Sequence, residues 1–390
     1  MFAVFNAARK SFVALLALSA LLWLSACQPM ALSGSGNFQA GVPVRVALLV
    51  PRGSEIGGDT LISDSLENAA RLAVADLEGV QIDLRVYATA GEAQRAELAA
   101  KQAVADGAQI IIGPLRAESA NAAAVAVAPS GVNVLAFSNN TTIAGGNLFL
   151  LGATFANTAE RLTAFAKRNG KDNILVIHDD EIGGQLGKAA ISQAIAQSGA
   201  RLAGTVSYER SQEGVSDAIQ RIKATKEATG ANAIFLTSTS DAALPFYAQM
   251  LPDVGISPQN TQFIGLSRWD IPAQNMQLSG LQGGWFALPQ PEAATAFSNR
   301  YAAAYGALPH PLAALAYDGL AAVGALASTG KPNALSGASL TQSAGFQGSN
   351  GIFRFRADGT NERGLAIGQI QDKKLVIIDA APRAFAGAGF

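Results

Sequence analysis

The chain has 390 residues, of which 49% are hydrophobic and 15% are charged, and its formal net charge is −1. This length exceeds what one hydrophobic core usually holds, so two domains are expected. The near-neutral charge without a basic stripe argues against nucleic acid as a partner. Cys27 is the single cysteine, which excludes a disulfide within the chain.

Residues 1–26 have the pattern of a secretory signal peptide. Arg9 and Lys10 precede SFVALLALSALLWLSA, an uncharged and mostly apolar run that is short for a transmembrane span. Once this leader is removed, 26 basic and 29 acidic residues remain, a net charge of −3. We therefore exclude residues 1–26 from the fold.

Residues 24–27, Leu-Ser-Ala-Cys, resemble the bacterial lipobox, in which the cysteine becomes the first residue and carries lipid. The resemblance implies several acyl chains on Cys27, and two or more chains anchor a protein stably. Gln28 stands where aspartate favours the inner membrane, so the resemblance implies the outer membrane of a Gram-negative cell, with the protein in the periplasm. Residues 27–43 then form the lipidated N-terminus and a flexible tether. The alternative is an ordinary secreted protein with a stray cysteine.

Short apolar runs alternate with Ala-rich segments at helical spacing through most of the chain. Continuous apolar strands are typical of sheets buried on both faces, and helical connections impose parallel pairing. We expect an α/β fold with two doubly wound parallel-sheet lobes. The predicted strands are 45–51, 82–87, 109–114, 132–137, 173–178, 232–237 and 262–267.

The C-terminal part departs from this alternation. Helical patterns at 291–306 and 312–328 precede strands separated by ADG and DKK turns, which indicate β-hairpins and a return of the chain between lobes. The predicted division follows the leader and the tether. Lobe 1 comprises 44–155 and 289–338, lobe 2 comprises 156–288 and 339–381, and 382–390 is a tail.

Loops rich in hydroxyl and amide side chains follow the predicted strands. The carboxyl ends of strands are where ligands bind in such sheets. Ser119 falls in the first turn of a predicted helix, where the free N–H groups and the helix dipole favour an anion such as a carboxylate. Ordinary helix capping is the alternative for each loop taken singly.

The stretch GPLRAESANAAAVAVAPSGVNVLAFSNNT resembles leucine/isoleucine/valine-binding proteins, and later segments match the same family in order. These are NILVIHDDEIGGQLGKAAISQAIAQSGARLAGTVSY, FIGLSRWD, AYDGLAAV and FRADGTNERG. The resemblance covers about residues 44–380 and implies a type I periplasmic binding fold. It implies two lobes that are joined by three crossovers and close on a solute.

The resemblance also implies positions for ligand-binding residues. Ser119 matches the serine that binds the ligand carboxylate, and Ser138, Asn139 and Asn140 form the adjacent ligand loop. Trp269 is a further candidate, which could stack on a ligand or pack in the core.

Three positions depart from the family pattern. Ser267 stands where an acidic residue holds an amino acid's ammonium, Thr239 stands where a tyrosine is common, and Gly183 replaces an aromatic residue. A buried ammonium without a carboxylate is costly, so amino-acid specificity would need Asp241 or Asp270 as a substitute.

No enzymatic motif occurs in the required strand-to-helix context, neither GxSxG nor a phosphate-binding glycine loop. His178 stands beside Asp179 and Asp180, but no second histidine or cysteine lies near it to complete a metal site. We expect a protein that is not an enzyme and has no metal, cofactor or nucleic acid.

Two functions fit these expectations. In the first, the protein binds a small polar, amino-acid-like solute and passes it to an ABC permease, as in branched-chain amino-acid transport. In the second, it resembles the outer-membrane lipoprotein activators of penicillin-binding proteins, which regulate peptidoglycan synthesis. Gln28 and the altered pocket favour the second; the absence of an added N-terminal helical-repeat domain favours the first.

Overall fold

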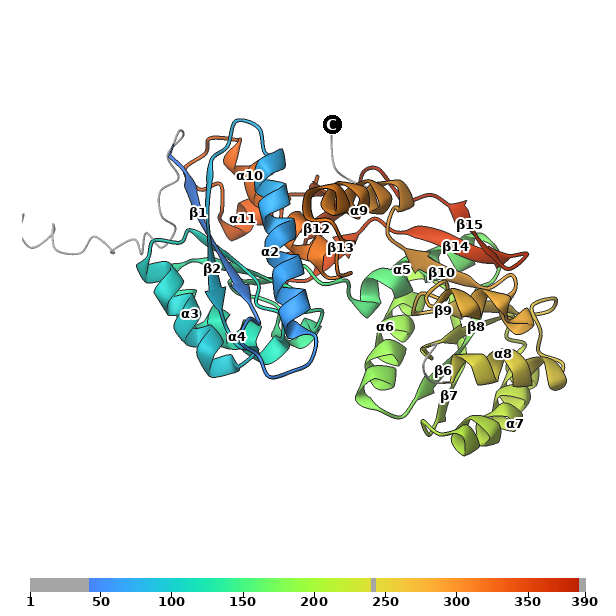
Figure 1. The fold of residues 1–390 in the computed structure, drawn as a ribbon. Helices are drawn as coiled ribbons and strands as arrows, with labels where there is room; N and C mark the ends of the chain where they lie inside the picture. Colours follow the sequence, from blue (N-terminus) through green and yellow to red (C-terminus); the bar gives the residue numbers. More distant parts are fainter. Residues whose placement is uncertain (1–41, 240–242, 386–390) are drawn as a thin grey trace, which may run out of the picture.

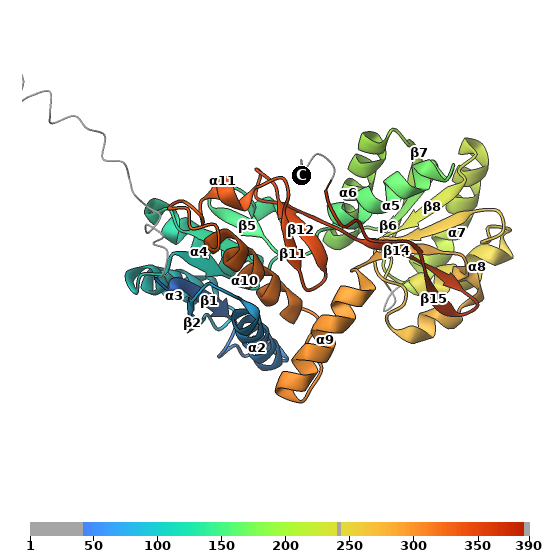
Figure 2. The same ribbon diagram turned by 90° about the horizontal axis from the view of Figure 1, so that it is seen from above.

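The computed structural model describes residues 42–239 and 243–385, which form two lobes side by side (Figures 1 and 2). The predicted signal peptide, Cys27 and nearly all of the tether lie outside these residues. Among the described helices, none is long and apolar enough to cross a membrane.

The first lobe is built on a parallel sheet with the strand order β2-β1-β3-β4-β5. Alternate residues of β1 enter two cores: Val46 and Leu48 face one side, whereas Ala47 and Leu49 face the other. This period of two is the geometry of a strand buried on both faces. The strands are β1 (Val44–Val50), β2 (Ile82–Ala88), β3 (Ile110–Ile112), β4 (Asn133–Ala136) and β5 (Leu148–Leu150).

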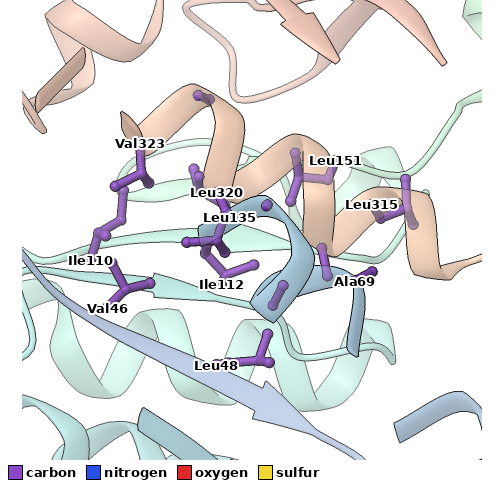
Figure 3. Close-up of a cluster of buried hydrophobic side chains, with 14 of the residues drawn as sticks. Val46, Leu48, Ala69, Ile110, Ile112, Leu135, Leu151, Leu315, Leu320 and Val323 are labelled. Carbon is purple, nitrogen blue, oxygen red and sulfur yellow. The ribbon is translucent and has the colours of Figure 1, made fainter. Parts of the chain in front are cut away.

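Helices cover both faces of this sheet. One face packs against α2 (Asp59–Asp76) and α10 (Ala313–Ala327), and the other against α3 (Ala93–Ala105) and α4 (Ala117–Val127). Figure 3 shows the first of these cores, where Leu320 and Val323 of α10 approach the strand residues. Two more helices, α9 (Pro291–Tyr305) and α11 (Gly337–Leu340), complete the lobe.

The second lobe has a mixed sheet with the order β15-β14-β10-β9-β8-β6-β7, in which β14 runs antiparallel to both of its neighbours, β10 and β15. One face packs against α5 (Phe155–Arg168) and α6 (Ile182–Ser198), and the other against α7 (Gln212–Thr229) and α8 (Leu244–Asp253). The strands are β6 (Asn173–Asp179), β7 (Arg201–Tyr208), β8 (Ala233–Leu236), β9 (Gln262–Gly265), β10 (Trp285–Leu288), β14 (Ala366–Gln371) and β15 (Lys374–Asp379).

A small antiparallel sheet corrects the predicted lobe boundary at residue 339. Its strands are β11 (Phe346–Gly348), β12 (Gly351–Phe355) and β13 (Asn361–Arg363). Phe346, Phe353 and Phe355 lie in the core of the first lobe, whereas the second lobe resumes with β14. The burial of these phenylalanine side chains against α10 holds this segment in the first lobe. That burial is a result of the tertiary packing.

Within the described residues the chain passes between the lobes three times, as the family resemblance implied. The passages lie between β5 and α5, between β10 and α9, and between β13 and β14. Asn361 ties the first passage to the third, because its amide donates to the carbonyls of Leu150 and Gly152, each at 2.8 Å. In turn, Asn157 of α5 donates to the Asn361 carbonyl at 2.9 Å.

Each predicted strand is present, and the two C-terminal hairpins and both late helices are confirmed. Four strands, β5, β7, β10 and β11, were not predicted from the sequence. β5 and β10 are short, and β7 is an edge strand whose first residues are exposed, so it lacks a continuous apolar run.

A buried ion pair joins α10 to β13. Arg363 Nη1 lies 3.0 Å from Asp318 Oδ2, and the side chains are 6% and 0% exposed. Asp318 Oδ1 accepts hydrogen bonds from the Ser349 backbone N–H at 2.7 Å and the Ser349 hydroxyl at 2.8 Å. Arg363 also donates to the Leu151 carbonyl at the first passage. The pair therefore fixes the hairpin against the hinge.

We predict that Asp318→Asn lowers the free energy of unfolding by about 3–5 kcal/mol, because it leaves the Arg363 charge buried without a counter-ion. Urea unfolding measures the loss. Glu97→Gln is the control, since it breaks an exposed ion pair with Lys101 and should cost under about 1 kcal/mol. Equal losses in the two variants would contradict the role of the pair.

Candidate functional site: a cavity between the lobes

A cavity of about 820 Å³ lies at the junction of the lobes and is lined from both sides. This volume is typical of sites for small molecules. The first lobe contributes the segments after β3 and β4, and the second contributes those after β9 and β10. The connection between α9 and α10 supplies Pro309, His310, Pro311 and Leu312.

The segment after β3 positions charged groups at the start of α4. Gly113 has a positive φ of 89°, and a Cβ there would lie 2.2 Å from the Leu49 carbonyl oxygen, so the turn requires glycine. Arg116 and Glu118 follow and line the cavity. No side chain in the described part of the chain caps α4, which leaves its first N–H groups available at this wall.

The segment after β4 is shaped by short-range hydrogen bonds. Ser138 Oγ accepts from the Asn140 N–H at 3.1 Å, and Asn140 Oδ1 accepts from the Thr142 N–H at 3.0 Å and the Thr142 hydroxyl at 2.8 Å. Ser138 is buried, whereas Asn139 is exposed. All three predicted residues of this loop, Ser138, Asn139 and Asn140, line the cavity.

Two arginines on opposite walls are held by aspartates behind them. Arg116 pairs with Asp59 at 2.8 Å, and Arg268, on the second-lobe wall, pairs with Asp270. The aspartate side chains are 3% and 9% exposed, whereas the arginines are 26% and 38% exposed. Each guanidinium is therefore oriented by a mostly buried carboxylate and remains partly open to solvent.

The remaining wall is mainly apolar. Phe137 comes from the first lobe, Leu266 and Leu288 from the second, and Phe297 and Leu315 from α9 and α10. His310 lies beside them, and its Nδ1 accepts the Leu312 N–H at 3.2 Å. Burial lowers the pKa of His310, which favours the neutral ring and preserves this acceptor.

Three predicted site residues lie away from the cavity lining. Ser119 is 1% exposed and its hydroxyl donates to the Gly91 carbonyl at 3.2 Å. Ser267 donates to the Ser238 carbonyl at 3.2 Å. Thr239 is exposed. The structure thus brings the 138–140 loop to the wall and leaves these three outside it.

Trp269 is a core residue in this structure, which corrects its assignment as a ligand contact. Its side chain is fully buried, and it packs against Phe286 with ring centroids 6.4 Å apart. A Cβ on Gly265 or Gly284 would lie 2.3 Å and 2.4 Å from the indole, so these glycines make room for the ring. Of the proposed substitutes for the missing acid, Asp270 is engaged with Arg268, and Asp241 lies outside the described residues.

The two arginines and the residues of the α9–α10 connection were not among the predicted site residues. Arg116 and Arg268 each follow a predicted strand, so the pattern of one arginine in a strand-end loop of each lobe was a usable signal. Phe297 and His310 carried no such signal, because α9 and the connection between α9 and α10 reach the cavity only through the tertiary packing of the first lobe.

His178 is buried, and its Nδ1 lies 2.8 Å from the Asp179 carbonyl oxygen. Across the described ranges, no group of three His, Cys, Asp or Glu side chains is arranged to hold a metal ion.

The chain matches the family model described as "Periplasmic binding protein" over residues 43–374. No curated protein sequence matches it significantly.

Solved structures of similar fold cover most of the chain. A candidate branched-chain amino acid ABC transporter protein from Rhodospirillum rubrum has a TM-score of 0.72 at 19% identity, covering 86% of this chain and 100% of that one. A substrate-binding protein from Desulfitobacterium hafniense in complex with Leu gives 0.60 at 18%, covering 86% and 100%. A solute-binding protein from Rhodopseudomonas palustris BisB5 with 3,4-dihydroxybenzoic acid gives 0.57 at 18%, covering 87% and 96%. At these identities the likeness concerns the fold.

The lowered pKa of His310 predicts a loss of stability in acid. Between the ordinary value of 6.5 and the lower value in the folded protein, the unfolded chain binds more protons, so the free energy of unfolding falls as pH falls through this window. His310→Asn removes the titrating group and retains an acceptor for the Leu312 N–H. In urea titrations between about pH 7 and 5, the wild type should lose stability relative to this variant; parallel curves would contradict the prediction.

Proposed function

Because the chain belongs to the periplasmic binding protein family, we propose that it binds a small solute between its lobes and presents it to an ABC-type permease. The observation that carries this proposal is the cavity at the lobe junction, with walls from both lobes and from the crossings between them. The role is one of binding, as the family is non-enzymatic.

The three passages between the lobes form the hinge of the proposed cycle. Two lobes that are joined at one side can rotate about a few residues, and a solute that touches both walls stabilises the closed state. Arg356 of the first lobe and Glu160 of α5 form an ion pair at 2.8 Å across the hinge. This pair is a direct contact between the lobes on the hinge side.

The solute that fits this cavity is small, with a polar end and an apolar body. The polar end would meet Ser138, Asn139 and Asn140, and the body would lie along Phe137 and Phe297. The similar proteins crystallised with leucine and with 3,4-dihydroxybenzoic acid bind solutes of this build. A branched-chain amino acid or a related amino-acid-like solute is accordingly our first candidate.

We further propose that the mature protein is periplasmic and anchored through lipid on Cys27, with residues 28–43 as the tether. An extended tether spans at most about 3.5 Å per residue, so the membrane that holds the anchor restricts which partner the lobes reach.

The binding proposal predicts that a solute stabilises the protein. In a thermal-shift screen of the mature chain with Cys27→Ser against amino acids and aromatic acids, a solute at 100 times its dissociation constant should add about 2.7 kcal/mol to the free energy of unfolding. Small-angle scattering should then show a smaller radius of gyration as the cleft closes. A flat screen across all solutes would contradict the proposal.

The anchoring proposal predicts that Cys27→Ser moves the protein from the membrane fraction to the soluble periplasmic fraction. If the unaltered protein lost its leader but was not retained on the membrane, that result would contradict the anchoring proposal. Sucrose-gradient separation of the two membranes adds a second readout: inner-membrane location supports docking to a permease, whereas outer-membrane location favours the alternative, activation of a penicillin-binding protein.

A further inference from the structure

Two partly exposed guanidinium groups face one cavity from opposite lobes, and neither belongs to the ligand residues expected from the sequence. We propose that the solute is a carboxylic acid whose carboxylate is held between Arg116 of the first lobe and Arg268 of the second. This inference rests on the proposed solute binding and specifies its chemistry.

Arg116 retains donor capacity after pairing with Asp59. Its Nη2 donates to Asp59 Oδ1 at 2.9 Å and lies 2.8 Å from Oδ2, whereas Nη1 is buried and has no hydrogen-bond partner in the described part of the chain. Nη1 lies close to Gly91, where a Cβ would be 2.5 Å away. The lack of a side-chain cap on α4 adds backbone donors at the same wall.

Arg268 is oriented in a similar way on the second lobe. Its Nε donates to Asp270 Oδ1 at 3.0 Å and its Nη2 donates to Oδ2, so the carboxylate occupies one edge of the guanidinium. Among residues 42–239 and 243–385, nothing accepts a hydrogen bond from its Nη1. The free edge therefore remains available to a second anion.

When the cleft closes, the affinity for a solute depends on whether that solute can accept hydrogen bonds from the two arginines. Both arginines lose water when the lobes approach, and a desolvated charged donor without an acceptor is costly. A carboxylate accepts from both guanidinium groups and forms charge-assisted hydrogen bonds with them. A neutral solute of the same shape would leave these donors without partners, so it should bind weakly.

The wall offers less to an ammonium group. Glu118 is the one carboxylate that lines the cavity in the described ranges, and its side chain is exposed at the start of α4. An ion pair at such an exposed position contributes little. The carboxylate, more than an α-amino group, is thus expected to determine affinity.

Matched probes test the acid requirement in the wild-type mature protein. Isothermal calorimetry compares leucine with leucinamide and 4-methylpentanoate, and 3,4-dihydroxybenzoate with 3,4-dihydroxybenzamide. We expect an acid to bind and its amide to bind at least about 10-fold more weakly, as expected for loss of hydrogen bonds to charged groups. An amide that binds within about threefold of its acid would overturn the inference.

Substitutions test the two arginines. Arg268→Gln should weaken binding of the acid by about 10-fold or more, with partial recovery in Arg268→Lys, and should leave the weak binding of the amide unchanged. Arg116 is tested as Arg116→Gln with Asp59→Asn, which removes the buried charge together with its partner. Arg95→Gln is the matched control, because Arg95 is an exposed arginine of α3 whose side chain is 62% exposed.

Thermal unfolding establishes that each variant is folded before its affinity is measured. Unchanged acid affinity in folded Arg268→Gln, or in the folded double variant, would overturn the inference. A neutral solute that bound tightly and closed the cleft would overturn the proposed role of Arg116 and Arg268. The proposed binding of a small solute between the lobes would still stand. Failure of every probe and of the broader solute screen would reject both.

Discussion

Parallel strands joined through helices place their carboxyl ends at one edge of a sheet, and this protein brings two such edges to the passages between its lobes. The constraint puts the segments after β3 and β4 opposite those after β9 and β10 around one cavity. The passages hold the two edges together through Asn361, whose amide donates to the Leu150 and Gly152 carbonyls at the start of the first crossing and whose carbonyl accepts from Asn157 of α5. The cavity therefore depends on sheet topology and on the hinge equally.

Local sequence predicted the body of the fold because its signals are short-range. Val46 to Val50 form an apolar run, and both faces of that strand are buried, so the run alone indicates the environment. The same reasoning failed at Phe346 and Phe353, whose strands look like part of the late hairpins but pack on α10. Membership in a lobe is a property of tertiary contacts, which the pattern along the chain does not contain.

The site was predictable only in part, for the same reason. The 138–140 loop was found because its position after a strand and its polar side chains are both local features. The burial of Trp269 depends on Gly284, fifteen residues further on, which leaves space for the indole. Arg116 acquires its orientation from Asp59, and their separation of 57 residues hides the pair from any local pattern.

Three arginines of the cavity share one arrangement and differ in exposure. Arg116, Arg268 and Arg363 are each paired with a mostly buried aspartate, which fixes the guanidinium plane. Arg363 is 6% exposed and donates to the backbone of the first crossing, so its charge is committed to the hinge. The other two keep a quarter or more of their surface open. A charged side chain stabilises the fold where its donors are engaged within the protein, and it stabilises a bound ligand where donors remain unpaired. The same arginine–aspartate pair therefore supports the hinge at Arg363 and solute recognition at Arg116 and Arg268.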